Sequence, residues 1–308
     1  MEKINIPLTV PKKMQAEYRK NFNLATRNTG KLMMFAGDQK VEHLNDDFVG
    51  RGIPLEVADP EHYFKIAAQA KIGVFATQLG LIAKYGRDYP NVPYLIKVNS
   101  KTNLVTQKQK DPFSNRWLHI HDIIEFKKQT KLNIVGVGYT IYIGSNYESD
   151  MFGQAARIIY KAHQAGLITV IWMYVRGRAI KKENNLHLIA GGAGVALCLG
   201  ADFVKLSYPY NLSPEKAALG FKEVTSAAGR TGVICIGGAK KNPLTFLKHL
   251  DSQINIARTK GNAVGRNIYQ RPLKESIRMA NAIAAVCLYN YSAADAYQIF
   301  LDKKKLKN

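Results

Sequence analysis

Short runs of apolar residues alternate along the chain with longer segments in which apolar residues recur at helical spacing. The short runs begin near residue 32, and their Val and Ile content is typical of strands buried on both faces. Strands are predicted at residues 32–38, 73–77, 93–99, 133–139, 169–176, 202–208, 232–238 and 262–267. Amphipathic helices are predicted at residues 60–71, 119–130, 150–165, 185–199, 213–228, 243–257 and 272–288. Strands that alternate with helices in this way predict a parallel sheet.

Eight strand–helix units within about 240 residues favour a closed barrel over an open sheet. We therefore predict an α/β fold, a single (β/α)8 TIM barrel. No linker or change in composition marks a second domain, so the prediction assigns residues 1–308 to one domain. Residues 1–30 are expected to form an N-terminal extension whose leading helix covers the barrel floor. Residues 302–308 are expected to form a basic, solvated tail.

The net charge of +21 changes the range of partners to consider. A large positive charge is typical of proteins that bind nucleic acids. No helix-turn-helix, zinc-finger or aromatic-rich RNA-binding pattern accompanies it here. A general excess of surface lysine, together with attraction of small anionic substrates, is therefore the favoured interpretation.

The cysteines and the apolar runs bear on the compartment. Cys198, Cys235 and Cys287 are isolated from one another and odd in number, which indicates reduced thiols rather than disulfides or zinc ligands. The apolar runs fall short of the roughly 20 residues that a membrane span requires, and the N-terminus lacks the apolar segment of a secretory signal. A cytoplasmic protein without a membrane partner is predicted.

In a barrel of this kind the chemistry takes place where the strands end, and the strand at 202–208 carries a lysine there. Alternation sends Val204 and Leu206 toward the helices and Lys205 into the barrel. Loss of solvation lowers the pKa of an inward lysine, and a neutral amine attacks carbonyls to form an imine. The alternative is an ammonium group that reaches solvent or pairs with a carboxylate. Lys97, in the third strand, is the alternative imine-forming residue.

Two further strand ends carry side chains suited to a sugar phosphate. Trp172, Tyr174 and Arg176 share the inward face of the fifth strand, where they could shield an imine, move a proton and hold an anion. The alternative is that Tyr174 and Arg176 only cap the barrel rim. Asp38 ends the first strand, where it could polarise the inward lysine, and His43 follows in the loop.

The seventh and eighth strands end in glycine-containing segments. Gly237 and Gly238 follow Ile236, and Gly265 precedes Arg266. Loops after these two strands are the usual phosphate-binding loops of the fold, because their backbone amides and a helix start face the anion. A single Gly-Gly pair could mark no more than a turn, but two such ends in these two units predict a phosphate site.

Six segments together resemble the archaeal-type class I fructose-bisphosphate aldolases, which are related to deoxyribose-phosphate aldolase-like barrels. The segments are GDQKVEH (37–43), VGYTIYIGS (137–145), WMYVRG (172–177), ADFVKLSY (201–208), IGGAKK (236–241) and AVGRNIYQR (263–271). Two positions depart from the family pattern. Gln39 stands where the family often has histidine, and Val175 stands where it often has proline.

The resemblance implies a role for each matching residue. Lys205 would form the Schiff base, Tyr174 would transfer protons and Asp38 would be the partner carboxylate. The substrate pocket would be lined by Trp172, His43 and Arg176. A substrate phosphate would be held by Ile236, Gly237, Gly238, Gly265 and Arg266. The resemblance also implies a homo-oligomer that needs no metal or other cofactor.

The implied reaction is the reversible, metal-independent cleavage of fructose 1,6-bisphosphate to dihydroxyacetone phosphate and glyceraldehyde 3-phosphate. A Schiff-base aldolase that acts on another phosphorylated sugar would share the same motifs. An alternative from a different class is a basic, nucleic-acid-binding barrel without catalysis.

Overall fold

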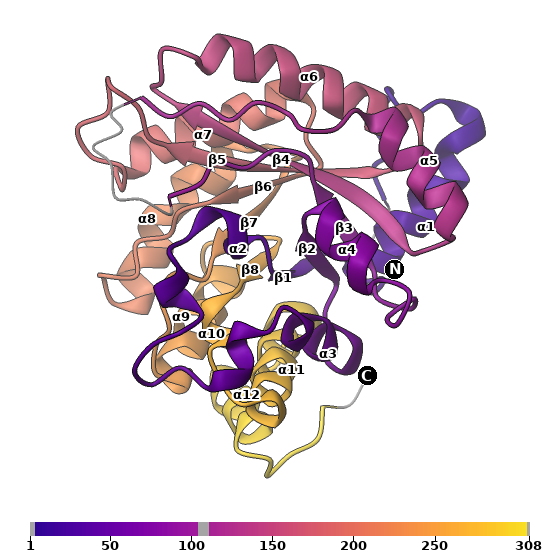
Figure 1. The fold of residues 1–308 in the computed structure, drawn as a ribbon. Helices are drawn as coiled ribbons and strands as arrows, with labels where there is room; N and C mark the ends of the chain where they lie inside the picture. Colours follow the sequence, from indigo (N-terminus) through magenta and orange to yellow (C-terminus); the bar gives the residue numbers. More distant parts are fainter. Residues whose placement is uncertain (1–3, 104–110, 307–308) are drawn as a thin grey trace.

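The computed structural model describes residues 4–103 and 111–306. Eight parallel strands close into a barrel in chain order, β1-β2-β3-β4-β5-β6-β7-β8 (Figure 1). Their bounds are β1 Leu32–Ala36, β2 Val74–Thr77, β3 Tyr94–Lys97, β4 Ile134–Ile143, β5 Ile168–Val175, β6 Phe203–Leu206, β7 Gly232–Ile236 and β8 Gly261–Val264. Pairing of β1 with β8, which aligns Leu32 with Gly261, closes the ring. The predicted TIM barrel is confirmed.

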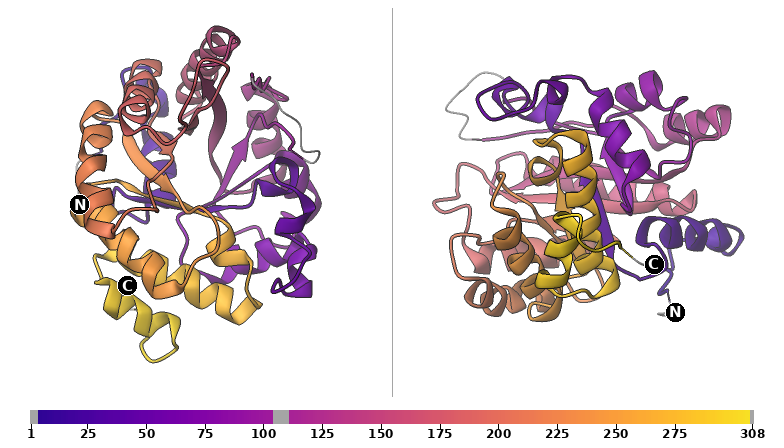
Figure 2. Two further views of the ribbon diagram at one scale, coloured as in Figure 1. Left: turned by 90° about the vertical axis from the view of Figure 1, so that its left-hand side faces the viewer. Right: turned by 90° about the horizontal axis from the view of Figure 1, so that it is seen from below.

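Helices surround the ring of strands on all sides (Figure 2, left). Those that connect or follow the strands are α2 Gln39–Glu42, α3 Glu61–Gln69, α4 Leu79–Tyr85, α5 Ile120–Thr130, α6 Glu148–Gln164, α7 Leu186–Leu199, α8 Pro214–Ala227, α9 Pro243–Asn255, α10 Arg266–Tyr269, α11 Leu273–Tyr289 and α12 Ala293–Phe300. In Figure 1, α6 and α7 cover one side of the barrel, and α11 and α12 cover the opposite side. The seven helices predicted from the sequence are present.

The core has two layers, which follow from the alternation of side chains along each strand. The outer layer lies between strands and helices and includes Val204 and Leu206. The inner layer fills the barrel and includes Phe203, from the same strand. This division confirms the predicted direction of the β6 side chains. Lys205, which points inward, therefore lies next to a packed apolar interior.

The N-terminal segment closes one end of the barrel, as predicted. Helix α1, Gln15–Thr26, follows a short 3-10 turn, η1, Lys12–Met14. Tyr18 of α1 belongs to the inner core, and its hydroxyl donates to Asp202 at 2.5 Å, just before β6. Phe22 stacks on Phe203 with ring centroids 5.8 Å apart. The floor of the barrel is therefore plugged by side chains of α1.

The sequence prediction was incomplete in several connections. Helices α4 and α12 and the one-turn helices α2 and α10 were not predicted, and β4 continues to Ile143. Of the predicted tail, Asp302–Lys305 are exposed, and Leu306 packs against the outer core; residues 307 and 308 lie outside the described part. Among the described residues, no helix is long and apolar enough to cross a membrane.

Candidate active site

Lys205 lies at the carboxyl end of β6, directly beside Trp172 of β5 in the sheet register. Its Nζ lies 4.9 Å from the centroid of the Trp172 ring, and the residue is 5% exposed. Burial lowers the pKa of Lys205, and Lys97 lowers it further, against the opposing effect of Asp38. Within the described residues Lys205 makes no hydrogen bond or ion pair. These conditions favour a neutral amine that is available to attack a carbonyl.

Room for the Trp172 indole is provided by β4. The Trp172 ring lies over Gly138, two residues before its register partner Thr140, and a Cβ on Gly138 would lie 2.3 Å from Cζ3 of Trp172. Only glycine at this position therefore leaves room for the indole next to Lys205. The indole Nε1 is buried without a hydrogen-bond partner among the described residues.

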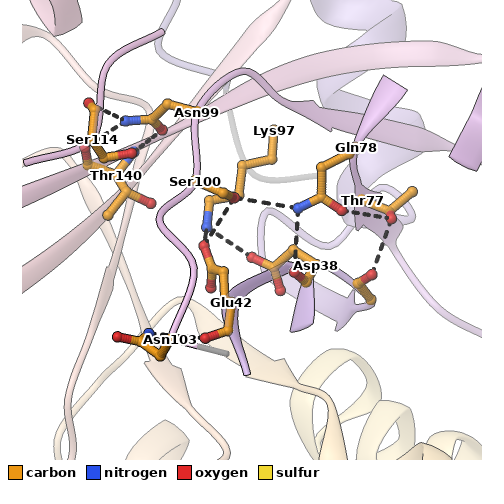
Figure 3. Close-up of polar contacts among 11 residues, drawn as sticks. Asp38, Glu42, Thr77, Gln78, Lys97, Asn99, Ser100, Asn103, Ser114 and Thr140 are labelled. Carbon is orange, nitrogen blue, oxygen red and sulfur yellow. Dashed lines mark hydrogen bonds and ion pairs between the residues drawn. The ribbon is translucent and has the colours of Figure 1, made fainter. Parts of the chain in front are cut away.

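A second lysine, Lys97 at the end of β3, binds two carboxylates (Figure 3). Its Nζ donates to Oδ2 of Asp38 at 3.0 Å and to Oε1 of Glu42. Asp38 directly precedes α2 and Glu42 is its last residue, so a spacing of four residues places both carboxylates on one side of the turn. Ser100 Oγ also donates to Oε1 of Glu42, at 3.1 Å.

The charges of this cluster determine its protonation. Burial alone would raise the pKa of Asp38, but Lys97 and Lys205 lower it to about 2. Burial alone would lower the pKa of Lys97, but Glu42 and Asp38 raise it above its ordinary value. The cluster therefore contains an ionised aspartate and an ammonium group beside a lysine whose charged form is disfavoured.

Tyr174 lies beyond Trp172 on the same inward face of β5, as predicted. It stacks on Tyr142 of β4 with centroids 5.8 Å apart and an interplanar angle of 21°. Burial, reinforced by Glu42 and Asp38, raises the pKa of Tyr174 well above its ordinary value, so the phenol keeps its proton at neutral pH. It can donate that proton and take it back. Arg176 directly follows β5, and Glu183 accepts two hydrogen bonds of 2.7 Å from its guanidinium.

The loop after β1 meets the loop after β8. Oδ2 of Asp47 pairs with Nδ1 of His43, and Oδ1 of Asp47 lies 3.5 Å from Nη1 of Arg266. His43 and Arg266 are thus joined through one carboxylate, and the guanidinium of Arg266 retains donors for another anion.

The predicted phosphate-binding glycines lie in two adjacent loops. Gly238 has a φ of 68°, which favours glycine, and a Cβ on Gly265 would lie 2.4 Å from Nε2 of Gln39. The N–H of Gly237 donates to the carbonyl of Ala263 at 2.9 Å. The Gly237 amide therefore already has a hydrogen-bond partner within the barrel. Gly238 and Gly265 lack a side chain, so another group can come close to the backbone at these two positions.

Several buried polar atoms around the site have no partner among the described residues, and they include Asp38 Oδ1, Gln39 Oε1 and Trp172 Nε1. Buried polar groups in proteins are nearly always hydrogen-bonded. Two of these atoms belong to adjacent residues just after β1, and unpartnered groups of this kind suit a small ligand with several hydroxyl groups. In the part of the chain that the structure describes, no group of three or more His, Cys, Asp and Glu side chains could hold a metal ion.

The structure thus brings together Lys205, Trp172, Tyr174 and Asp38, and it adds residues that the sequence prediction did not assign. Glu42 had no predicted role, and Lys97 was considered only as an alternative imine-forming residue. A signal for both was present. Lys97 follows the inward Leu95 by two residues, and Glu42 follows Asp38 by four, but the short helix α2 was not predicted.

The chain is similar to several known proteins. Residues 32–271 match the DeoC/LacD family of aldolases. A Methanocaldococcus jannaschii protein named fructose-bisphosphate aldolase/6-deoxy-5-ketofructose 1-phosphate synthase is 53% identical over 302 residues, 98% of this chain and 96% of that protein. The structure of the fructose-bisphosphate aldolase from Slackia heliotrinireducens has a TM-score of 0.96 and 46% identity, and the match covers 100% of this chain and 96% of that chain. An archaeal fructose-1,6-bisphosphate aldolase, solved with its catalytic lysine covalently bound to the carbinolamine intermediate, has a TM-score of 0.74 and 30% identity over 88% of this chain and 99% of that chain.

Proposed function

Because the chain belongs to the DeoC/LacD family of aldolases, we propose that it is a class I fructose-bisphosphate aldolase that forms its Schiff base on Lys205. The reaction is the reversible cleavage of fructose 1,6-bisphosphate to dihydroxyacetone phosphate and glyceraldehyde 3-phosphate. The observation that carries the assignment to Lys205 is its buried amine, which lies on the Trp172 indole and has no carboxylate partner among the residues that the structure describes.

The first half of the reaction forms the imine. The lone pair of neutral Lys205 attacks C2 of the open-chain sugar, and the carbonyl oxygen takes a proton to give a carbinolamine. Loss of that oxygen as water gives a protonated imine, which can accept an electron pair. Ionised Asp38 exchanges protons with the carbinolamine oxygen, and the Trp172 ring limits access of bulk water.

In the second half the carbon–carbon bond breaks. A general base removes the proton of the C4 hydroxyl, the C4 carbonyl forms, and the C3–C4 electron pair moves into the imine to give an enamine. Tyr174 then protonates the enamine carbon. Water adds to the resulting imine and releases dihydroxyacetone phosphate, which restores the Lys205 amine.

We assign binding of the substrate to residues around these groups. Arg266 donates to a phosphate from the loop after β8. The backbone near Ile236, Gly237, Gly238 and Gly265 lets the phosphate approach closely. His43, in the loop after β1, and Arg176, directly after β5, contact the sugar chain. Support comes from the Asp47 link between His43 and Arg266 and from the guanidinium donors that Glu183, Asp47 and the other described residues leave unused.

A second candidate is an aldolase reaction whose ketose carries only one phosphate. The M. jannaschii relative is named for such a product, a 1-phosphate, in addition to the bisphosphate. One observation favours it here: Glu183 already pairs with Arg176. The Arg176 guanidinium therefore does not need a second substrate phosphate to balance its charge. Comparing kcat/KM for fructose 1,6-bisphosphate with that for fructose 1-phosphate distinguishes the two.

We also propose that the chain, as a single domain spanning residues 1–308, acts as a cytoplasmic homo-oligomer. Helix α7 has no Asp, Glu, Lys or Arg, yet Leu188 and Leu197 are each 38% exposed. In a chain of charge +21, an uncharged apolar helix face supports contact with a second copy. Free Cys198, Cys235 and Cys287 fit a reducing compartment. Sedimentation equilibrium tests the assembly, and a monomer at all concentrations would refute it.

Trapping the covalent intermediate tests the proposed function. Incubation with dihydroxyacetone phosphate and borohydride should inactivate the enzyme and add one reduced adduct per chain, on the peptide that contains Lys205. Lys205→Met should abolish both the adduct and aldol cleavage, and Lys205→Arg should fail too because a guanidinium stays charged. Full activity without any adduct would refute the Schiff-base mechanism.

A further inference from the structure

Two lysines lie against one indole ring in this site. The Nζ of Lys205 lies 4.9 Å from the Trp172 centroid and the Nζ of Lys97 lies 5.1 Å from it. Both residues are buried, at 5% and 0% exposure. A substrate carbonyl bound at this ring is therefore close to two amines, and the reaction requires that only one of them forms the imine.

The two amines differ in the carboxylates that touch them. Lys97 is bound by Asp38 and by Glu42, whereas Lys205 has no carboxylate partner among the described residues. Glu42 is itself held firmly: Ser100 Oγ donates to its carboxylate at 3.1 Å, and Asn103 Nδ2 donates to its carbonyl at 2.9 Å. The difference therefore rests on a fixed carboxylate rather than on a mobile side chain.

We propose that Glu42 is a positioning residue that makes imine formation selective for Lys205, because it holds Lys97 as an ammonium ion. The inference rests on the proposed function and goes beyond it by assigning the choice between the two lysines. An ammonium nitrogen has no lone pair with which to form the N–C2 bond, so the carbonyl electrons cannot be displaced onto oxygen and no water is lost. Lys97 instead remains a cation that orients Asp38 toward the substrate.

Removal of the Glu42 charge should expose the hidden reactivity of Lys97. The charged and titratable groups that face Lys97 are Asp38, Glu42, Tyr142 and Lys205. In Glu42→Gln, only Asp38 of the two carboxylates remains to raise the pKa of Lys97, while burial and the neighbouring Lys205 still lower it. The pKa of Lys97 therefore falls. Each unit of decrease raises the neutral fraction about tenfold at a pH below that value. The amide oxygen of Gln can still accept from Ser100 and Lys97, which preserves the local hydrogen bonds.

The experiment maps reduced adducts by peptide mass. The folded full-length chain is incubated with dihydroxyacetone phosphate and borohydride between pH 7 and pH 9. Wild type should be labelled on Lys205 alone, whereas Glu42→Gln should also carry label on Lys97, because its neutral fraction rises about tenfold for each unit by which its pKa falls. Glu223→Gln is the matched control, since this exposed carboxylate pairs with exposed His187 on the outer helices and should leave Lys205 the sole site.

A second pair of variants removes competition between the two amines. Lys205→Met alone should give no adduct, whereas Lys205→Met/Glu42→Gln should give an adduct on Lys97. Lys97→Arg, which keeps the charge without a reactive amine, should retain much more aldol cleavage than Lys97→Met. Should Glu42→Gln fail to fold by circular dichroism, Glu42→Asp with Lys205→Met provides the same test, because it withdraws the carboxylate by one methylene.

The outcomes separate this inference from the proposed function. Folded Glu42 variants that never label Lys97 would overturn the role of Glu42 while leaving Lys205 as the Schiff-base residue. Label on Lys97 in the wild type would overturn it as well. Absence of any adduct in the active wild type would instead overturn the proposed function itself.

Discussion

Replacement of Arg266 by alanine is the perturbation that isolates phosphate binding from the chemistry at Lys205. A charge-assisted hydrogen bond contributes about 1.5–3 kcal/mol, which corresponds to a change of roughly 10- to 150-fold in affinity. The Arg266 side chain is 29% exposed and Asp47 lies 3.5 Å away, so solvent and the carboxylate both weaken its hold on an anion. We therefore expect KM for fructose 1,6-bisphosphate to rise by roughly 10- to 30-fold, in the lower part of that range.

The assay couples aldol cleavage to reduction of the triose phosphates by a nicotinamide-dependent dehydrogenase, with initial rates across a wide range of substrate concentration. The value of kcat should change little, because a contact that is equally strong in the ground and transition states affects KM alone. Arg230→Ala is the matched control, since Arg230 is exposed just before β7, at the opposite end of the barrel. An unchanged KM in an Arg266→Ala variant with normal urea unfolding would refute phosphate binding by this residue.

Three other expected outcomes concern the catalytic groups. Tyr174→Phe should lower kcat by about 10²- to 10⁴-fold while borohydride still traps the imine, and near-normal turnover would make the tyrosine structural. Asp38 has a folded-state pKa of about 2 against 3.8 for an unperturbed group. It should therefore contribute about 2 kcal/mol of stability that is complete above roughly pH 5 and is lost as pH falls toward 2. Urea unfolding of Asp38→Asn should show less acid dependence than wild type between pH 7 and pH 3, and identical slopes would count against an ionised Asp38. Incubation with EDTA should leave aldol cleavage intact, and activity lost to EDTA but restored by zinc would indicate metal-dependent chemistry.

The strands were predictable because a parallel barrel buries both faces of each strand and so leaves continuous apolar runs. The alternation of Phe203 and Lys205 against Val204 and Leu206 even gave the inward direction of β6 correctly. Helix α4 was not predicted because its seven residues are too few to show a helical period. Helix α12 follows the eighth unit, where the strand–helix repeat no longer provides an expectation.

The site was predictable as far as residues lie at strand ends, and the family match confirms the resemblance drawn from the six motifs. Pairwise contacts between loops could not be predicted from the sequence. The spacing of four residues indicates that Glu42 shares a side with Asp38, but it does not indicate contact with Lys97, which is 55 residues away, because that contact depends on how β1 and β3 lie in the closed ring. The Glu183 contact that occupies Arg176 likewise depends on how the loop after β5 folds back.

The plug of α1 has a consequence for the order in which the chain folds during synthesis. Tyr18 donates to Asp202 across 184 residues of sequence, and Thr9 Oγ1 lies 2.6 Å from Nδ1 of His163 across 154. The segment that contains α1 leaves the ribosome before β5 and β6, yet the surface that it covers does not exist until those two strands have been made. At about 5–20 residues per second, its apolar side chains wait roughly ten seconds or more for their binding partners. Docking of α1 on these partners therefore follows the synthesis of β5 and of the first residues of β6.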